Sequence, residues 1–403
     1  MLQAEARVIT SEPRYQLRPY QSEAVRIAVA FLKDAKRSWN AIEVLPTGSG
    51  KSLVIANIAA CLNAPTLVFQ PSKEILEQNH EKYISYGNPA SIYSASVGQK
   101  RLSDVTFATI GSVIRKPHIL HDFKFIIIDE CHFVNAKQGM YCDLLKALGN
   151  VKVLGLTATP YRLVTDGFGG SILKFLTRTR PRVFRDVIYC VQNEDLFLSG
   201  FLAKLRYRQG EKFDRRQLRL NTTGADYTDR SVQEYYHRVN FSQRVSDQVN
   251  EAMTQMRNAL VFTRFIQESQ YIVNHVPGSA IVTGETPKAE RERIIRLFRS
   301  GEIRVVCNVG VLTTGFDFPE LETVILARPT MSLALYYQMI GRGIRPHADK
   351  ECTEIIDLCD NYSQFGPIEK LRLVNSGNGK WIISNDGRQL TNIYYGDRPY
   401  VAR

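Results

Sequence analysis

The sequence contains no pair of cysteines spaced as Cys-x-x-Cys, no low-complexity tract, and no apolar run near the roughly 20 residues that cross a bilayer. Its seven cysteines are odd in number and irregularly spaced, which is a poor framework for disulfides, so we expect reduced thiols. The stretch from Met1 to Arg14 carries charges and lacks the apolar segment of a signal peptide. These absences predict a cytoplasmic protein without a membrane role.

The charge balance is strongly basic, with 52 Lys and Arg against 40 Asp and Glu and a net charge of +12. Such an excess favours a polyanionic partner such as nucleic acid, although solubilising surface charge is an equally open interpretation. The excess is concentrated between Arg162 and Arg219, where 13 basic and 6 acidic residues leave a net +7. Five aromatic residues are interleaved with this basic segment and could either stack on bases or pack in the core: Phe168, Phe175, Phe184, Tyr189 and Phe201.

Apolar strand-like runs alternate with helical patterns in two successive halves of the 403 residues, which predicts an α/β protein with two parallel-sheet lobes. We expect strands at 41–45, 66–70, 105–109, 125–128 and 151–156, then at 259–262, 279–282, 304–307, 323–327 and 354–358. Helices are expected at 242–257, 267–275 and 287–299. The predicted domains are a first lobe (1–165), a basic inter-lobe region (166–241), a second lobe (242–370) and a C-terminal extension (371–403).

A glycine-rich segment lies between the first expected strand and a helix, which is the context of a phosphate-binding loop. Its backbone N–H groups can surround phosphate oxygens, Lys51 can reach the β- and γ-phosphates, and Ser52 can ligate Mg²⁺. Leu45 stands where the usual motif has its first glycine, and a simple glycine-rich turn is the alternative. The predicted nucleotide-binding residues of this loop are Thr47, Gly48, Ser49, Gly50, Lys51 and Ser52.

Two adjacent acids, Asp129 and Glu130, follow directly on the apolar strand at 125–128. A carboxylate at the end of a parallel strand is placed to hold Mg²⁺ together with Ser52, and the second carboxylate can then polarise the attacking water. The alternatives are a helix cap at Asp129 and a zinc site using Cys131 and His132.

With these motifs in order, the sequence resembles the superfamily 2 helicases, whose two RecA-like lobes bind ATP in the cleft between them. The resemblance spans about residues 15 to 360. Leu17-Arg18-Pro19-Tyr20-Gln21 is similar to the family's adenine-recognition motif, which implies that Arg18 and Gln21 bind the nucleotide. Thr157-Ala158-Thr159-Pro160 resembles the motif that couples nucleotide state to strand grip, with an ordinary turn as the alternative.

The resemblance also implies nucleic-acid contacts in both lobes and a second set of nucleotide contacts. Leu312-Thr313-Thr314-Gly315-Phe316-Asp317 resembles motif V, from which Gly315 and Asp317 are expected to bind nucleotide. The family's short strand-contact motifs imply a nucleic-acid interface at Pro71, Ser72, Lys73, Thr109, Gly111, Ser112, Thr263, Arg264, Gly284 and Thr313.

The string from Gln338 to Pro346 resembles motif VI and implies three further catalytic residues, Gln338, Arg342 and Arg345. Arginines three residues apart can lie on one helix face and stabilise charge on the transferring phosphoryl group. Together with Lys51, Asp129 and Glu130, they complete the predicted catalytic set, with ATP and Mg²⁺ as cofactors.

The box Asp129-Glu130-Cys131-His132 and the Gln at 338 distinguish the chain from DEAD-box RNA helicases and resemble the RadD-type DNA-repair helicases. That type carries a cysteine-rich zinc region beyond the motor, which the residues up to Arg403 do not contain. We therefore predict a monomeric helicase or translocase acting on single-stranded, forked or branched DNA in repair or recombination. An RNA helicase, a restriction-type duplex translocase and an ATP-gated clamp without turnover are the alternatives.

Overall fold

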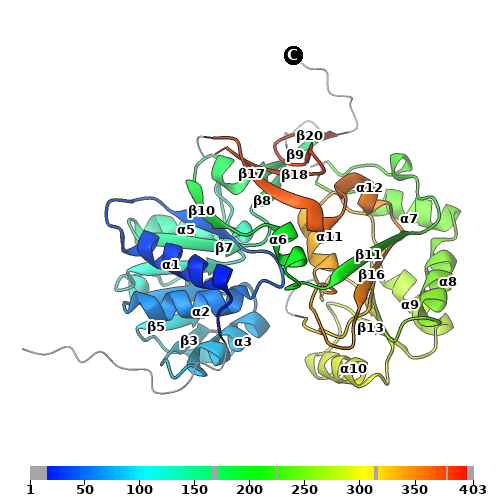
Figure 1. Ribbon diagram of the computed structural model, residues 1–403, viewed down its shortest axis with the longest axis horizontal. Helices are drawn as coiled ribbons and strands as arrows, with labels where there is room; N and C mark the ends of the chain where they lie inside the picture. Colours follow the sequence, from blue (N-terminus) through cyan, green and yellow to red (C-terminus); the bar gives the residue numbers. More distant parts are fainter. Residues whose placement is uncertain (1–15, 166–169, 223–224, 313–315, 378–379, 397–403) are drawn as a thin grey trace, which may run out of the picture. The chain divides into compact units, whose positions relative to one another are not determined.

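The computed structural model describes residues 16–165, 170–222, 225–312, 316–377 and 380–396 (Figure 1). The chain forms two compact units. The first comprises the chain up to Pro46 together with Gly50–Pro160 and Leu176–Val191, and the second comprises Thr47–Ser49, Tyr161–Phe175 and the chain from Gln192 onward. Within the described residues, no helix combines the length and apolar character of a membrane span.

The first unit is built on an eight-stranded sheet in the order β10-β1-β7-β6-β2-β5-β3-β4, parallel except for the pairing of β3 with β4. Its central strands are buried along their whole length because helices cover the sheet, as the run Ile126-Ile127-Ile128 requires. The strands are β1 (Ala41–Val44), β2 (Thr66–Phe69), β3 (Ser91–Ser94), β4 (Gln99–Lys100), β5 (Val105–Ala108), β6 (Phe125–Asp129), β7 (Lys152–Thr157) and β10 (Asp186–Cys190).

Helices of the first unit pack against each other and against the sheet through their small and apolar faces. The helix α1 (Pro19–Lys33) begins with proline, where the missing N–H costs nothing, and buries Ala24, Ala28 and Phe31 against α2 and the sheet. The remaining helical segments are α2 (Lys51–Leu62), α3 (Lys73–Ile84), α4 (Ile110–Val113), η1 (Pro117–Leu120), η2 (Cys131–Phe133) and α5 (Met140–Leu148).

The second unit contains a six-stranded, fully parallel sheet in the order β11-β16-β15-β12-β14-β13. Figure 1 shows β11 and β16 side by side, although about 140 residues separate them in the chain. The strands are β11 (Lys204–Gln209), β12 (Ala259–Thr263), β13 (Ser279–Val282), β14 (Val305–Asn308), β15 (Thr323–Ala327) and β16 (Cys352–Asp357).

The core of the second unit joins the sheet to three helices and to the segment before them. Val232 and Tyr236 of α7, Val245 of α8 and Ile272 of α9 share one apolar cluster with Phe213. The helical segments are α6 (Asn193–Leu198), η3 (Leu176–Arg178, in the first unit), η4 (Arg215–Gln217), α7 (Asp229–Arg238), α8 (Phe241–Met253), α9 (Ile266–His275), α10 (Lys288–Ser300), α11 (Leu333–Ile340), α12 (Asn361–Phe365) and η5 (Ile368–Lys370).

Two small antiparallel sheets complete the second unit. One has the order β17-β18-β19, and Gln192 pairs with the backbone of Leu373 in both directions at 2.9 Å. The other has the order β20-β9-β8. Their strands are β17 (Leu371–Asn375), β18 (Trp381–Asn385), β19 (Arg388–Gln389), β8 (Tyr161–Thr165), β9 (Gly170–Phe175) and β20 (Tyr394–Gly396).

All ten strands and three helices expected from the sequence are present, which confirms the α/β architecture with two parallel sheets. The segment predicted as an inter-lobe region, 166–241, supplies an edge strand to each sheet, β10 to the first and β11 to the second. Of its aromatic residues, Phe175 and Phe184 are core residues, and Phe168 lies outside the described residues.

Candidate nucleotide and nucleic-acid sites

The motifs of the first unit meet at one edge of its sheet because they follow neighbouring parallel strands. The phosphate-binding loop follows β1, and Glu130 follows β6. Thr157 is the last residue of β7, and Ala158 and Thr159 come directly after it. The strands β2 and β5, next in the sheet, lead to the segments at Ser72 and Thr109. The carboxyl edge of an open parallel sheet is where ligands bind in this architecture.

Two glycines give the phosphate-binding loop its backbone shape. Gly48 and Gly50 have φ angles of +77° and +81°, a region that residues with a Cβ rarely adopt, and Gly50 is the N-cap of α2. A Cβ on Gly50 would lie 2.4 Å from Nε2 of Gln21, so only glycine allows this close approach. The structure thereby brings the predicted adenine-recognition motif against the predicted phosphate loop.

Gln21 is held in a fixed orientation at the start of α1. Its side chain is 3% exposed, and its Oε1 accepts a hydrogen bond from the backbone N of Arg18 at 2.9 Å. Arg18 Nη1 donates to the Tyr20 hydroxyl at 3.3 Å, and the Tyr189 hydroxyl donates to the Tyr20 carbonyl at 3.1 Å. The strand β10 therefore fastens this motif to the first sheet, a contact that the sequence did not predict.

Glu130 is the centre of a polar network that includes the loop lysine. Its Oε1 lies 3.3 Å from Lys51 Nζ, and its Oε2 lies 3.1 Å from His132 Nδ1. The Thr157 hydroxyl donates to Oε2 at 3.2 Å, and His132 Nδ1 lies 2.9 Å from the Thr157 Oγ1 and 3.1 Å from that of Thr159. Three motifs separated along the chain thus meet at one carboxylate.

The two acids of this box have different protonation behaviour. Burial, followed by the neighbouring negative charge of Glu130, raises the pKa of Asp129 to about 7. Burial also acts to raise the pKa of Glu130, but the positive charge of Lys51 and the hydrogen bond with His132 outweigh it and hold this pKa well below its usual value. Glu130 is therefore ionised at neutral pH, whereas Asp129 is partly protonated there.

The donors at this edge fit MgATP. A hydroxyl at Ser52 and a carboxylate at Asp129 are the hard oxygen ligands that Mg²⁺ takes, usually one or two from protein with the rest from phosphates and water. The first two N–H groups of α2, at Lys51 and Ser52, precede the first helical hydrogen bonds and can receive phosphate, whereas Leu53 N already donates to the Gly50 carbonyl at 2.9 Å. The alternative zinc site gains no support, because Cys131 is fully buried and no group of three ligating side chains occurs in the described parts of the chain.

Some residues of the first unit that are predicted to contact nucleic acid also make hydrogen bonds within the protein. The Ser72 hydroxyl caps α3 by accepting from Ile75 N at 3.3 Å. The Thr109 and Ser112 hydroxyls lie 2.8 Å apart, and Ser112 accepts from Ala95 N at 2.8 Å. Pro71, Lys73 and Gly111 belong to the same two segments, and a Cβ on Gly111 would meet open space.

In the second unit, the segments of motifs V and VI contact each other. Arg342 Nη1 donates to the Phe316 carbonyl at 2.7 Å, and Arg345 Nη1 lies 2.9 Å from Asp317 Oδ2. Arg342 Nε also donates to the backbone carbonyl of Gln338, on α11, at 3.3 Å. Thr313 and Gly315, predicted to contact nucleic acid and nucleotide, lie outside the described residues.

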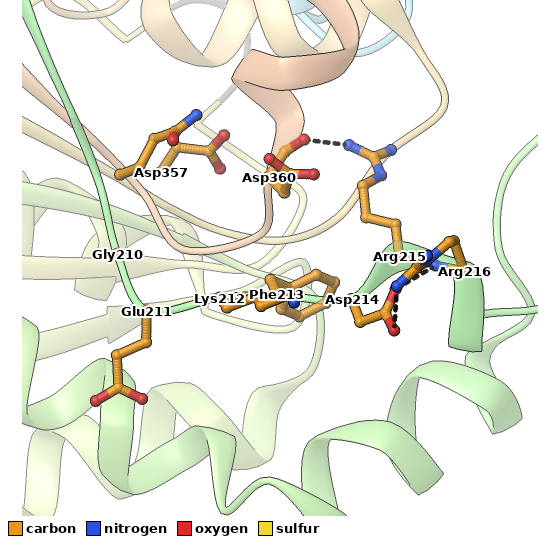
Figure 2. Close-up of a pocket in the computed structure, with 10 residues that line it drawn as sticks. Gly210, Glu211, Lys212, Phe213, Asp214, Arg215, Arg216, Asp357 and Asp360 are labelled. Atoms are coloured by element: carbon orange, nitrogen blue, oxygen red, sulfur yellow. Dashed lines mark hydrogen bonds and ion pairs between the residues drawn. The ribbon is translucent and has the colours of Figure 1, made fainter.

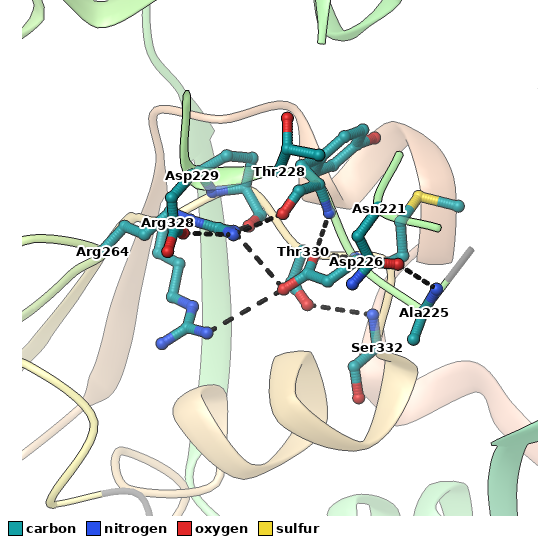
Figure 3. Close-up of polar contacts among 12 residues, drawn as sticks. Asn221, Ala225, Asp226, Thr228, Asp229, Arg264, Arg328, Thr330 and Ser332 are labelled. Atoms are coloured by element: carbon teal, nitrogen blue, oxygen red, sulfur yellow. Dashed lines mark hydrogen bonds and ion pairs between the residues drawn. The ribbon is translucent and has the colours of Figure 1, made fainter. Parts of the chain in front are cut away.

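Arg264, predicted to contact nucleic acid, is held by acceptors from its own lobe (Figure 3). Its side chain is 8% exposed, and its guanidinium donates to the Asp229 carboxylate at 2.9 Å and to the Tyr227 carbonyl at 2.6 Å. Asp226 lies 3.4 Å from Arg264 and 3.9 Å from Arg328, and it accepts from Met331 N at 3.2 Å. This network ties the turn before α7 to the ends of β12 and β15.

The neighbouring predicted contact, Thr263, is buried with its hydroxyl 2.7 Å from that of Ser269. Gly284 lies two residues after β13, and a Cβ added to it would have no atom within 4 Å. The structure thus places Thr263 in the lobe interior and Gly284 at an open position, and the nucleic-acid roles of both stay predictions.

A cavity of about 570 Å³ lies at the ends of β11 and β16 (Figure 2). Several of its charged groups have partners within the protein: Arg215 donates to the Asp360 backbone carbonyl at 3.0 Å, and Asp214 binds Arg216 at 2.8 Å. The Asp357 carboxylate accepts from the backbone N of Tyr362 at 2.7 Å. The cavity is therefore lined in part by groups that stabilise the lobe.

Sequence reasoning did not include His132, Thr157 and Thr159 among the site residues, although it identified the motifs that contain them. Their side-chain chemistry could have identified them, because an imidazole and two hydroxyls can form hydrogen bonds that orient a catalytic carboxylate. It also missed the partners of Arg264, since Asp226 and Asp229 lie about 35 residues earlier in a segment without a motif.

Comparisons with known families match both halves of the chain. Residues 14–162 match the family described as type III restriction enzyme, res subunit, and residues 243–347 match the helicase conserved C-terminal domain. The two matches fall on the two parallel sheets and contain the motifs described above, from the adenine-recognition motif to motif VI.

Relatives of known name are similar over most of the chain. A 51.5 kDa protein of Lactococcus phage is 28% identical over 80% of this chain, a DNA 3'-5' translocase XPB2 of Sulfurisphaera tokodaii is 27% identical over 87%, and a DNA 3'-5' helicase XPB of Kineococcus radiotolerans is 27% identical over 84%. The chain spans 66%, 84% and 59% of their respective lengths.

Among solved structures, the chain resembles an ATP-dependent type ISP restriction-modification enzyme bound to DNA, with a TM-score of 0.61 and 18% identity. The similarity covers 85% of this chain and 28% of that enzyme. It concerns the fold, and it agrees with two RecA-like lobes of parallel sheet.

Proposed function

Because the chain belongs to the superfamily 2 helicases, we propose that it hydrolyses ATP to move along DNA or to unwind it. The observation that carries this proposal is the convergence of Lys51, His132 and Thr157 on the Glu130 carboxylate, beside a glycine loop shaped for phosphate. A chain that only bound nucleotide would not need an ionised, oriented carboxylate in this place.

In the proposed reaction, the first lobe binds the nucleotide and activates water. Gln21 recognises the adenine, the loop amides and Lys51 bind the phosphates, and Ser52 with Asp129 holds Mg²⁺. The metal ion, when bound, neutralises charge on the β- and γ-phosphates. Glu130 accepts a hydrogen bond from the attacking water, and its two neighbours, His132 and Thr157, fix the carboxylate's direction.

We assign to the second lobe the transition-state charge stabilisation that its motifs imply. Arg342 and Arg345 are the proposed phosphate-contacting arginines, assisted by Gln338. Gly315 and Asp317 are proposed to contact nucleotide. The ion pair between Arg345 and Asp317 supports an arrangement in which motif V senses the position of the motif VI arginine.

DNA is the proposed substrate because the relatives above are named as a DNA translocase and a DNA helicase. Backbone phosphates are the expected contacts, since a motor that reads bases specifically would stall. We further propose action on single-stranded, forked or branched DNA in repair, as a monomer in the cytoplasm, and keep the RadD-type assignment as a prediction.

A second candidate function is translocation on duplex DNA without strand separation. It is favoured by the match of residues 14–162 to the res subunit of a type III restriction enzyme. The two candidates share the ATPase site and differ in what the motor does to the duplex.

One experiment tests the proposal and separates the candidates. ATP hydrolysis is measured alone and with matched single-stranded DNA, forked DNA, blunt duplex and RNA, and the same substrates carry labels for strand separation and triplex displacement. Stimulation by DNA is expected. Unwinding of forks supports the helicase, and triplex displacement from an intact duplex supports the translocase. Stimulation by RNA alone would overturn the DNA assignment.

A further inference from the structure

Phe133 stands out among the aromatic residues of the first lobe because it is only half buried. It is 50% exposed, whereas the residues on either side, His132 and Val134, are buried. Within the described parts of the chain it is the only phenylalanine among the exposed large apolar side chains. A phenylalanine that is half exposed keeps apolar surface available to a ligand, and a nucleobase can stack on such a surface.

Phe133 lies at the same edge of the sheet as the residues of this lobe that are predicted to contact nucleic acid. It ends η2, the short turn that follows β6, and β6 is the immediate neighbour of β2, which leads to Ser72 and Lys73. The segment after it, from Lys137 to Met140, is exposed and adds a cation and an apolar side chain. Aromatic side chains combined with basic residues are typical of sites that bind single-stranded nucleic acid, and Lys137 follows Phe133 by four residues.

A direct chain of contacts connects this ring to the catalytic carboxylate. The Phe133 ring packs on the His132 ring, with centroids 4.3 Å apart and planes tilted by 41°. His132 Nδ1 lies 3.1 Å from Glu130 Oε2 and 2.9 Å from the Thr157 hydroxyl. Any displacement of the Phe133 ring therefore changes the packing of the imidazole that orients Glu130.

We propose that Phe133 is a stacking site for an unpaired nucleobase and that His132 links occupancy of this site to the Glu130 carboxylate. The ligand is a single-stranded nucleic acid, recognised by the π-face of any base and without sequence preference. The inference rests on the proposed function, because it names where the strand contacts the first lobe and how that contact reaches the ATPase site.

Photo-cross-linking locates the base directly in the wild-type protein. A single-stranded oligonucleotide with one 5-iodouracil is irradiated in complex with the full chain, and the adduct is mapped by mass spectrometry. The expected adduct lies on the peptide that contains Phe133. Adducts confined to other peptides would overturn the proposal, whereas DNA-stimulated ATP hydrolysis in the same sample would leave the proposed function standing.

Equilibrium binding supplies the energetic test, with an abasic oligonucleotide of equal length and charge as the reference. Stacking on one aromatic residue is worth about fivefold or more in affinity, so the wild type should prefer the base-bearing strand by at least that factor. Phe133→Ala should reduce the preference to within about twofold, and Phe133→Trp should keep it. Ile84→Ala, which truncates another exposed apolar residue of this lobe, should also keep it.

The outcomes separate the two claims. Equal affinity of the wild type for both strands, or an unchanged preference in Phe133→Ala, would contradict base stacking at this site while DNA-stimulated hydrolysis persists. Absence of binding to either strand would remove both the stacking site and the proposed function.

Discussion

Glu130 Oε1 lies 3.3 Å from Lys51 Nζ, which joins the end of β6 to the start of α2 within the first lobe. The other carboxylate oxygen contacts His132 and Thr157. Both oxygens of the carboxylate are therefore constrained by residues from three motifs. The direction from which Glu130 can meet a water molecule is fixed before any substrate binds.

Thr157→Val should slow ATP hydrolysis without preventing nucleotide binding. The valine keeps the volume but removes the hydroxyl that donates to Glu130, and a hydrogen bond to a charged group is worth about 1.5–3 kcal/mol, or about 10- to 100-fold in rate. Turnover under saturating ATP and DNA is compared with the Kd of a fluorescent ATP analogue. Thr157→Ser retains the hydroxyl and should stay within about threefold of the wild type. Equal rates for valine and wild type would show that the hydroxyl does not orient Glu130.

Gly343→Ala should destabilise the second lobe by overpacking. A Cβ at this position would lie 2.4 Å from Thr353 Cγ2 and 3.2 Å from Val324 Cγ2, and such insertions cost about 1–3 kcal/mol. Urea unfolding of the full chain measures the loss. The double variant Gly343→Ala/Thr353→Ser removes the nearest methyl group while it keeps the Thr353 hydroxyl bond to the Gly343 carbonyl, and it should recover part of the stability. Additive losses in the double variant would contradict this packing.

Arg264→Gln should lower the stability of the second lobe by about 2 kcal/mol or more, because the partly buried Asp226 loses its nearer cation and keeps only Arg328 at 3.9 Å. Arg230→Gln is the matched control, since its ion pair with Glu234 is exposed and should contribute little. Urea unfolding of both variants checks the difference, and equal stabilities would contradict it. The salt dependence of DNA binding is read in parallel: a slope reduced by about one would support the predicted phosphate contact at Arg264.

Glu268 should make the stability of the second lobe decrease with rising pH. Burial raises the pKa of this carboxyl, which is 4% exposed, from 4.5 to about 7, although it accepts a hydrogen bond from Phe265 N at 3.0 Å. A raised folded pKa means that the contribution is complete below the unfolded value and is lost as the pH rises through the folded value. The affected window is therefore about pH 4.5 to 7.

Glu268→Gln keeps the acceptor oxygen and removes the charge, so it tests this window. The variant should be more stable than the wild type at pH 8, by about 1–3 kcal/mol, and the advantage should shrink toward pH 5. Urea midpoints at the two pH values measure the difference. A pH-independent difference between the two proteins would show that Glu268 does not titrate in this range.

The central strands and the motif order could be predicted from the sequence because each depends on local pattern. Phe125 to Ile128 is apolar at every position, as a strand covered on both faces requires, and Asp129 and Glu130 follow it without a gap. The glycine at position 155 on β7 is required by packing that the pattern does not show. A Cβ there would come within 2.6 Å of Cys131 and displace the turn that carries Glu130.

The edge strands and the internal partners could not be predicted in the same way. The strand β11, Lys204 to Gln209, alternates charged and half-buried residues at a sheet edge, and this pattern is weak. The bonds between Arg264 and the turn at Asp226 depend on how that turn folds back on β12. The exposure of Phe133 likewise depends on how η2 packs on the sheet, so it could not be predicted from the local sequence Cys131-His132-Phe133.

The most direct measurement of the central claim is DNA-stimulated ATP hydrolysis by the wild type, Lys51→Ala and Glu130→Gln under identical conditions, with nucleotide binding measured in parallel. The account predicts stimulation in the wild type and loss of at least about 100-fold in both variants, with Glu130→Gln still binding ATP. Hydrolysis by Glu130→Gln at the wild-type rate would contradict the assignment of this carboxylate as the group that activates water.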